Sequence, residues 1–203
     1  MVMADVEEHR RRTEKDEDFP FVRACRDGDR EAFGVLVERH QKKMMNTAYR
    51  MLGDYDEACD VVQDAFVSAF RSIGTFREES RFVTWLTGIV INRGRTRLKQ
   101  LANRRRLEGP SRDGMDRAGS GPDTGNPVFD TVTKKEKSAR IQACISGLDE
   151  DQRAVLVLRD IQEFSYEEIT DILKIPDGTV KSRLFRARLA LRNCLKETMG
   201  DFL

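Results

Sequence analysis

The residue pattern best suited to binding chemistry in this sequence lies near its carboxyl end, from Ser165 to Arg192. Ser165 and Glu168 have the spacing of a capping box, which predicts the first turn of a short helix. The run from Lys174 to Gly178 predicts a tight turn, and a basic stretch with apolar periodicity follows it. A capped helix, a turn and a basic helix are the parts of a helix-turn-helix, in which the second helix enters the major groove of DNA.

The second helix of this motif separates into a polar face and an apolar stripe, formed by Val180, Leu184, Ala187 and Leu191. Phe185 lies about 140° around the helix from Val180, so packing of the stripe does not account for it. Arginine suits guanine edges and phosphates, and an exposed aromatic ring can contact a thymine methyl group. The residues predicted to touch duplex DNA are Lys181, Ser182, Arg183, Phe185, Arg186 and Arg188. A simple surface helix with a solvated basic face is the alternative.

A second cluster lies in residues 76–106, where aromatic and basic side chains alternate. Three aromatic residues stand beside two arginines: Phe76, Phe82, Trp85, Arg77 and Arg81. Residues 93–106 then contain seven basic residues and no acidic one, on a helix that Ser80 is placed to cap. Rings stack on unpaired bases and cations neutralise phosphates, so the pattern suits single-stranded or partly opened nucleic acid. Phe82 and Trp85 also have the helical spacing of core residues, and that explanation stays open.

An acidic run precedes this cluster. Residues 51–70 hold five acids and no base. A solvated helix face is the ordinary explanation of such a run. A docking surface for a basic partner is the functional alternative.

Material for catalysis or metal binding is scarce. The sequence has only two histidines, His9 and His40, and no phosphate-binding loop motif, so we expect no enzyme and no catalytic residue. Its cysteines are far apart and include no C-x-x-C pair, which predicts no metal site, and we expect no cofactor. They are Cys25, Cys59, Cys144 and Cys194. We expect small buried thiols at these positions, in a reducing cytosol.

Helical periodicity positions both clusters and predicts an all-α chain of two small domains. Four helices with short connections form the first domain, residues 19–106, after a charged tail, residues 1–18, that we expect to be disordered. Glycine, proline, serine and aspartate dominate residues 107–133, which we interpret as a flexible linker. Residues 134–198 form the second domain, which contains the helix-turn-helix. Neither a signal peptide nor an apolar run long enough to span a bilayer is evident, so we expect a cytoplasmic protein.

These pieces in this order resemble the extracytoplasmic-function group of the sigma-70 family, the promoter-specificity subunits of bacterial RNA polymerase. The matching runs are Asp60-Val-Val-Gln-Asp-Ala-Phe66, Phe76-Arg-Glu-Glu-Ser-Arg-Phe-Val-Thr-Trp-Leu86 with Asn92, and residues 148–195. Within the last run, Ser165-Tyr-Glu-Glu-Ile169 and residues 178–188 are especially close to the family pattern. The resemblance covers residues 19–106 and 134–196.

The resemblance implies that the first domain is sigma region 2. Its acidic helix would bind the clamp helices of the polymerase β′ subunit through Asp60, Gln63 and Asp64. The loop and basic helix that follow would bind the −10 promoter element, trap a flipped base and help to open the duplex. The residues implied in the −10 contact are Phe76, Arg77, Ser80, Trp85, Asn92, Arg93, Arg95 and Arg97. Gly88 and Gly94 depart from the family pattern by interrupting the helix after Trp85. Each lowers helix stability by about 1 kcal/mol relative to alanine in a helix interior.

The resemblance also implies that the second domain is region 4. It would read the −35 element as duplex through the predicted recognition helix and touch the flap of the polymerase β subunit. The linker would thread the core enzyme, and an anti-sigma factor is expected to cover the DNA- and polymerase-binding surfaces.

A helix-turn-helix regulator whose first domain dimerises or senses a ligand is the competing class. It would need a cavity or a self-complementary apolar face in residues 19–106. The acidic run and the aromatic-basic run favour polymerase and DNA contact instead. Association with core polymerase would separate the two classes.

Overall fold

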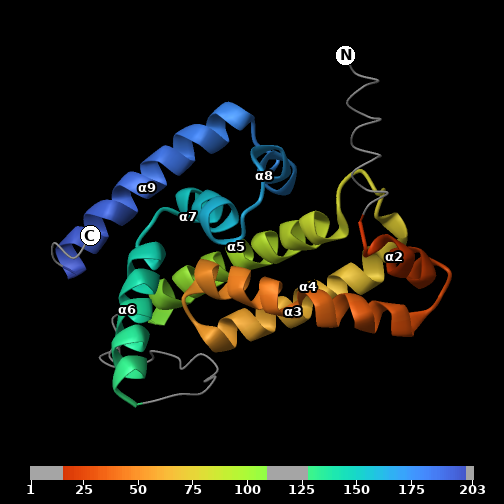
Figure 1. Cartoon of the computed structure of the whole chain (residues 1–203), viewed down its shortest axis with the longest axis horizontal. Coiled ribbons are helices and arrows are strands. Elements are labelled where there is room, and N and C mark those ends of the chain that lie inside the picture. The colour runs from red at the N-terminus through yellow and green to blue at the C-terminus, as the bar shows by residue number, and fades with distance from the viewer. Residues whose placement is uncertain (1–15, 109–127, 200–203) are drawn as a thin grey trace.

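The computed structural model describes residues 16–108 and 128–199, and every regular element within these ranges is a helix (Figure 1). The first range contains α2 (Phe19–Arg26), α3 (Arg30–Leu52), α4 (Tyr55–Ser72), the 3-10 helix η1 (Ile73–Thr75) and α5 (Phe82–Glu108). The second contains α6 (Val128–Ser146), α7 (Glu150–Leu156), the π-helix η2 (Val157–Ile161), α8 (Tyr166–Leu173) and α9 (Asp177–Met199). The all-α fold class is therefore confirmed.

Helices α5 and α6 extend into the segment 107–133 that we interpreted as a linker. α5 continues to Glu108 and α6 begins at Val128. The rest of that segment, and residues 1–15 of the expected tail, lie outside the described residues. Among the helices of the two described ranges, none has the length and apolar character needed to cross a membrane.

Side-chain caps fix where the helices begin. At α8 the Glu168 N–H donates to the Ser165 hydroxyl (3.2 Å) and the Ser165 N–H donates to the Glu168 carboxylate (2.9 Å), which is the capping box expected from the sequence. At α5 the Phe82 N–H donates to the carboxylate of Asp16 (3.0 Å). A residue from before α2 therefore takes the place that we expected Ser80 to fill.

Each group of helices buries an apolar face. In the first group, α3, α4 and α5 pack on one another, and α2 packs on α3. Their fully buried side chains include Leu36, Met44, Met51, Ala65, Leu86 and Ile91. In the second group, α7 and α8 pack on α9 and bury Val155, Leu158, Ile169, Val180 and Leu184. The two sets belong to one continuous core.

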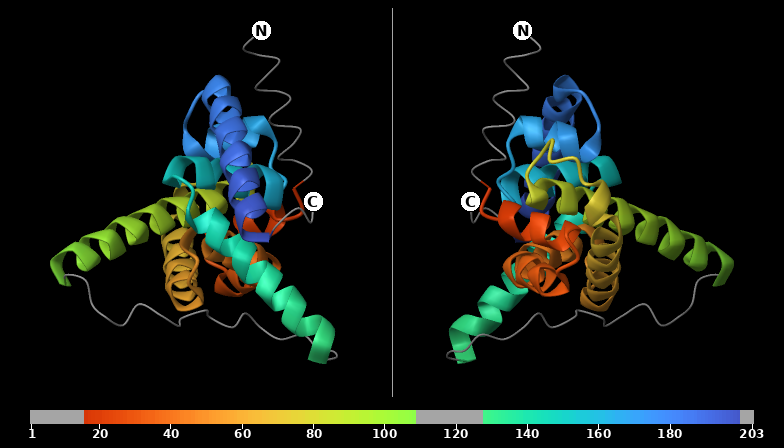
Figure 2. Two further views of the ribbon diagram at one scale, coloured as in Figure 1. Left: turned by 90° about the vertical axis from the view of Figure 1, so that its left-hand side faces the viewer. Right: turned by 90° about the vertical axis from the view of Figure 1, so that its right-hand side faces the viewer.

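The two groups of helices also pack directly against each other. Figure 2 shows α8 and α9 on one side of α5, with α3 and α4 on the other, while α6 and α7 contact α3 and α8 contacts α5. At this joint the buried Arg153 of α7 donates to the carbonyls of Met51 (2.6 Å) and Leu148 (3.0 Å). Gly53 has a φ of +77°, which favours glycine, and a Cβ atom there would lie 2.7 Å from the Ser146 hydroxyl of α6.

A disulfide joins α6 to α9. Cys144 and Cys194 are bonded, with their Cα atoms 5.8 Å apart. The expectation of four free thiols is wrong for this pair, whereas Cys25 and Cys59 are free. The two bonded cysteines are 50 residues apart, so only the packing of α6 on α9 shows that they meet. Across residues 16–108 and 128–199, no group of three or more histidine, cysteine or acidic side chains could hold a metal ion.

Candidate nucleic-acid interface

Helix α9 presents the predicted DNA-reading residues on one exposed side. Its opposite side is fixed in the core, where Val180 and Ala187 are fully buried and α7 and α8 pack against it. Phe185 is 70% exposed, as its place off the apolar stripe predicts. Lys181, Ser182, Arg186 and Arg188 are also exposed, and Arg183 is partly buried. A ring held in water among cations, on a helix braced from behind, is the arrangement that major-groove recognition requires.

Two of the exposed cations are paired with acids nearby. The Lys181 ammonium lies 2.6 Å from the carboxylate of Asp177, and this hydrogen bond raises the pKa of Lys181. The Arg188 guanidinium donates to both carboxylate oxygens of Asp160 (2.9 and 2.6 Å), which raises the pKa of Arg188. Both cations therefore stay charged at neutral pH. Because exposed ion pairs are weak, phosphate oxygens can replace these acids with little loss.

Aromatic side chains form a packed cluster at the start of α5. The centroid of the Phe76 ring lies 4.9 Å from that of Trp85 and 6.2 Å from that of Phe82. Phe76 and Phe82 are buried, so both have the core role in this conformation, and Trp85 keeps partial exposure. Of the other predicted −10 contacts on this stretch, Arg77 and Asn92 are exposed and Ser80 is partly exposed.

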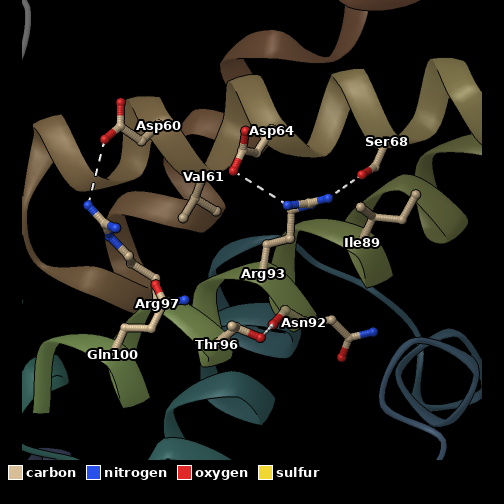
Figure 3. Close-up of a pocket in the computed structure, with 10 residues that line it drawn as sticks. All are labelled: Asp60, Val61, Asp64, Ser68, Ile89, Asn92, Arg93, Thr96, Arg97 and Gln100. Carbon is tan, nitrogen blue, oxygen red and sulfur yellow. Dashed lines mark hydrogen bonds and ion pairs between the residues drawn. The ribbon is translucent and has the colours of Figure 1, made fainter. Parts of the chain in front are cut away.

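A groove between α4 and α5 brings the acidic side chains predicted to bind polymerase opposite the arginine side chains predicted to bind the −10 element (Figure 3). The Arg93 guanidinium lies 3.4 Å from the Asp64 carboxylate. The Arg97 guanidinium lies 3.7 Å from the Asp60 carboxylate and donates to Glu57, a hydrogen bond that raises the pKa of Arg97. Two surfaces that the sequence suggested as separate are therefore one charged groove.

The outer side of α4 combines acidic and apolar side chains. The side chains of Asp60 and Asp64 are both 70% exposed, although each lies near an arginine. Gln63 is exposed between them in sequence, and Val67 and Phe70 are exposed further along the helix. A partner with basic and apolar side chains would find complementary groups on this helix.

Comparison with known proteins identifies what these surfaces belong to. The family described as "Sigma-70 region 2" matches residues 36–105, and "Sigma-70, region 4" matches residues 138–191. The RNA polymerase sigma-H factor of Pseudomonas aeruginosa is 34% identical over 194 residues, which cover 92% of this chain and 98% of that protein. The ECF RNA polymerase sigma-E factor of Escherichia coli K12 is 35% identical over 177 residues, 85% of this chain and 91% of that one. The chain belongs to the extracytoplasmic-function group of the sigma-70 family.

Solved structures of relatives agree with this assignment. CnrH, solved in complex with the cytosolic domain of CnrY, matches with a TM-score of 0.63 and 26% identity over 88% of this chain and 96% of that one. The sigma factor RpoE of Bartonella quintana, solved with the anti-sigma factor NepR, matches with a TM-score of 0.62 and 25% identity over 82% of this chain and 98% of that one. This sigma factor is therefore not an enzyme but a subunit that directs transcription initiation at promoters. We call α2–α5 region 2 and α6–α9 region 4 from here on.

Regions 2 and 4 are joined by ion pairs that use predicted DNA-binding residues. Arg95 of α5 pairs with Glu150 (3.3 Å) and Asp151 (2.7 Å) of α7. Arg183 of α9 pairs with the same Asp151 (2.6 Å). One carboxylate thus holds a predicted −10 contact and a predicted −35 contact together, and both arginines are partly buried.

A second joint between the regions is made by contacts that the sequence pattern did not predict. Arg81 of α5 donates to the carboxylate of Glu168 on α8 (3.0 Å). Burial alone would raise the pKa of Glu168, but hydrogen bonds from the Ser165 N–H and from Arg81 outweigh it and lower the pKa. The Lys43 ammonium donates to the carbonyl of Gln162 (3.2 Å), and burial lowers the pKa of Lys43. The capping box marked Glu168 as a helix-start residue, but no local signal marked its contact with region 2.

Proposed function

We propose that this sigma factor reads the −35 promoter element as duplex DNA through the exposed face of α9, with Phe185 and Arg186 at its centre. The observation that carries this proposal is the exposed ring and guanidinium on a helix whose other side is buried. Lys181 and Arg188 hold the flanking phosphates once these displace Asp177 and Asp160. Region 4 also meets the flap of the polymerase β subunit.

Region 2 has two tasks in this proposal. α4 docks on the clamp helices of the polymerase β′ subunit through Asp60, Gln63 and Asp64, and α5 binds the −10 element. Because Arg93 pairs with Asp64, a basic partner that binds this carboxylate releases Arg93 for phosphate, whereas Arg97 keeps its hydrogen bond to Glu57 until phosphate displaces it. Binding of polymerase and binding of −10 DNA therefore favour each other.

The two regions separate before they reach two distant promoter elements. Arg95 of α5 pairs with Asp151 of α7, so this arginine is not available to −10 DNA while the regions are packed together. We call the conformation in which regions 2 and 4 are packed together the closed conformation. It is accordingly the form without polymerase. An anti-sigma factor would hold such a form, and the similar sigma factor RpoE was solved in complex with one, NepR. The site of action is the bacterial cytoplasm, where RNA polymerase works.

Run-off transcription with core polymerase on promoters with randomised −35 and −10 elements tests these assignments. The wild-type chain should confer a choice of start site, which separates it from a free-standing helix-turn-helix regulator. Phe185→Ala and Arg186→Ala should each reduce discrimination at −35 positions by about tenfold or more. Lys196→Ala, on the exposed surface near the end of α9, is the matched control and should retain the wild-type preference. Unchanged −35 preference in both recognition variants would show that α9 does not read this element.

A further inference from the structure

Helix α6 has two sides that bind different regions of the sigma factor. On one side, the buried Gln142 donates to the carbonyls of Tyr49 (3.4 Å) and Arg50 (3.3 Å) at the end of α3. On the other side, Cys144 is bonded to Cys194 of α9. Gln142 and Cys144 are two positions apart, which places their side chains about 200° apart around a helix. α6 therefore connects region 2 to the helix that carries the DNA-reading face.

The two sulfur atoms differ in their access to solution. Cys144 is 3% exposed, with its Sγ 3.7 Å from the Thr198 hydroxyl, whereas Cys194 is partly exposed. The Cα separation of 5.8 Å is one that a disulfide spans without backbone movement, so the fold accommodates both the bonded and the reduced pair. Thiols are ordinarily kept reduced in the cytoplasm. Disulfides that form there in mesophiles are usually transient, catalytic or redox-sensing.

We propose that Cys144 and Cys194 are a redox-modification site, a thiol pair that a small disulfide such as oxidised glutathione converts to the α6–α9 cross-link. The more accessible Cys194 thiolate attacks one sulfur of the small disulfide and expels one small thiol. The Cys144 thiolate then attacks the Cys194 sulfur of the mixed disulfide and expels the second. Two protein thiols and one small disulfide become one protein disulfide and two small thiols, which carry both protons. Excess small thiol reverses the exchange.

The cross-link changes how regions 2 and 4 separate, a consequence that rests on the proposed function. In the reduced chain, the contacts of α6 with α3 and those of α7–α9 with region 2 can break one after another, because only non-covalent contacts and the turn at Gly147 join α6 to α7–α9. In the oxidised chain, α6 and α9 move as one body. The contacts of α6 with α3 and of α8 with α5 must then break together, which strengthens the closed conformation. Oxidation therefore lowers promoter use.

The chemistry is tested on the full-length chain without polymerase. Protein reduced with dithiothreitol is treated with oxidised glutathione, and its thiols are mapped by mass spectrometry of unreduced peptides. We expect a Cys144–Cys194 peptide pair that dithiothreitol removes, and a melting temperature about 10 °C higher in the oxidised form. A variant without the other cysteines, Cys25→Ala with Cys59→Ser, should form the same bond. Free thiols at both positions, or a bond to another cysteine, would overturn the site.

The consequence is tested by run-off transcription with core polymerase and oxidised or reduced chain. Oxidised wild-type chain should yield roughly tenfold less promoter-specific transcript than the reduced chain. Cys144→Ser and Cys194→Ser should be insensitive to oxidation, and the more exposed Cys194 supplies the test even if the other variant folds poorly. Equal transcript in both redox states, or an oxidation effect shared by the serine variants, would refute control by this bond. No start-site choice in either state would refute the proposed function and leave the thiol chemistry standing.

Discussion

Regions 2 and 4 both carry a basic helix, but they hold their cations differently. In α9, Phe185 and Arg186 at the centre of the face are exposed to solvent, whereas the other predicted DNA-binding cations pair with acids. These paired cations are Lys181, Arg183 and Arg188. In α5, Arg93 and Arg97 pair with acids of α4, and Arg95 pairs with region 4 itself. Two helices of similar composition therefore differ in how accessible their cations are to DNA. The centre of the α9 face can meet duplex DNA directly, whereas α5 must first exchange intramolecular acids for phosphates.

In the proposed function, that exchange makes the order of binding matter for region 2. Exposed ion pairs contribute at most about 1 kcal/mol each, so those across the groove between α4 and α5 break readily once a partner binds the acidic side chains. Without polymerase, a phosphate that displaces Asp64 from Arg93 still lies beside that negative carboxylate. In the proposed function, a basic polymerase surface binds the carboxylate and leaves Arg93 to attract the promoter.

The largest effect should come from the residue that ties the two regions together. Arg153→Ala removes a buried guanidinium that donates to the carbonyl of Met51 in region 2 and that of Leu148 in region 4. Both carbonyls lose a partner away from water, so we expect the free energy of unfolding to fall by about 3 kcal/mol. Urea unfolding followed by circular dichroism measures this change. Lys196→Ala is the control and should stay within about 0.5 kcal/mol of the wild type.

A loss much smaller than this for Arg153→Ala would mean that the regions are joined without help from the arginine. Other contacts, such as the pair between Arg95 and Asp151, would then hold the two regions together.

Replacing one arginine in each region tests the comparison directly. Arg186→Ala should weaken promoter binding by about 1–3 kcal/mol and relax preference at one −35 position, because it removes a base contact. Arg93→Ala should weaken binding on all promoters alike and reduce the salt slope by about 1, because it removes a phosphate contact. Affinity of the reconstituted holoenzyme for fluorescent promoter DNA over a range of salt concentrations provides both quantities. If Arg93→Ala changed preference at a single base, α5 would be reading sequence at that position.

Local sequence signals were sufficient to predict which side chains of α9 are buried and which are exposed. The capping box of Ser165 and Glu168 is present, and the apolar stripe of α9 is buried at Val180 and Leu184. Phe185 is exposed because a period of 3.6 residues per turn places it away from that stripe. Each of these features depends on neighbours within one or two helical turns, which is the range over which a sequence pattern carries information.

The features that escaped prediction depend on packing between distant segments. Asp16 caps α5, Cys144 meets Cys194, and Asp151 binds Arg95, and no local period encodes any of these pairs. Composition has a related limit in region 2. An aromatic ring beside arginines suits base stacking and core packing equally well. Phe76 is buried because it packs against the rings of Phe82 and Trp85 on α5, and composition does not encode that contact.

The smallest effect concerns the contact between Arg81 and Glu168, which adds charge to the joint between α5 and α8. The pKa of Glu168 lies below its ordinary value of 4.5, because hydrogen bonds from Ser165 and Arg81 outweigh burial. The charged carboxylate therefore stabilises the closed conformation when the pH is above that ordinary pKa. This contribution is lost as the pH falls through the lowered pKa. Arg81 is 45% exposed, so solvent screens the pair, and Glu168→Gln should cost less than about 1 kcal/mol at neutral pH.

The glutamine variant isolates the charge, because its amide oxygen still accepts the Ser165 N–H and keeps the capping box. Urea unfolding of both proteins from neutral pH into acid should show a stability gap that closes as the carboxylate of Glu168 is protonated. The pKa of Asp18 is also lowered, since its hydrogen bonds and attraction to His40 and Arg39 outweigh burial, but both proteins contain this group and its effect cancels. A gap that stayed constant with pH would trace the loss to the helix start within region 4. In that case the charge on Glu168 would not help to hold region 4 against region 2.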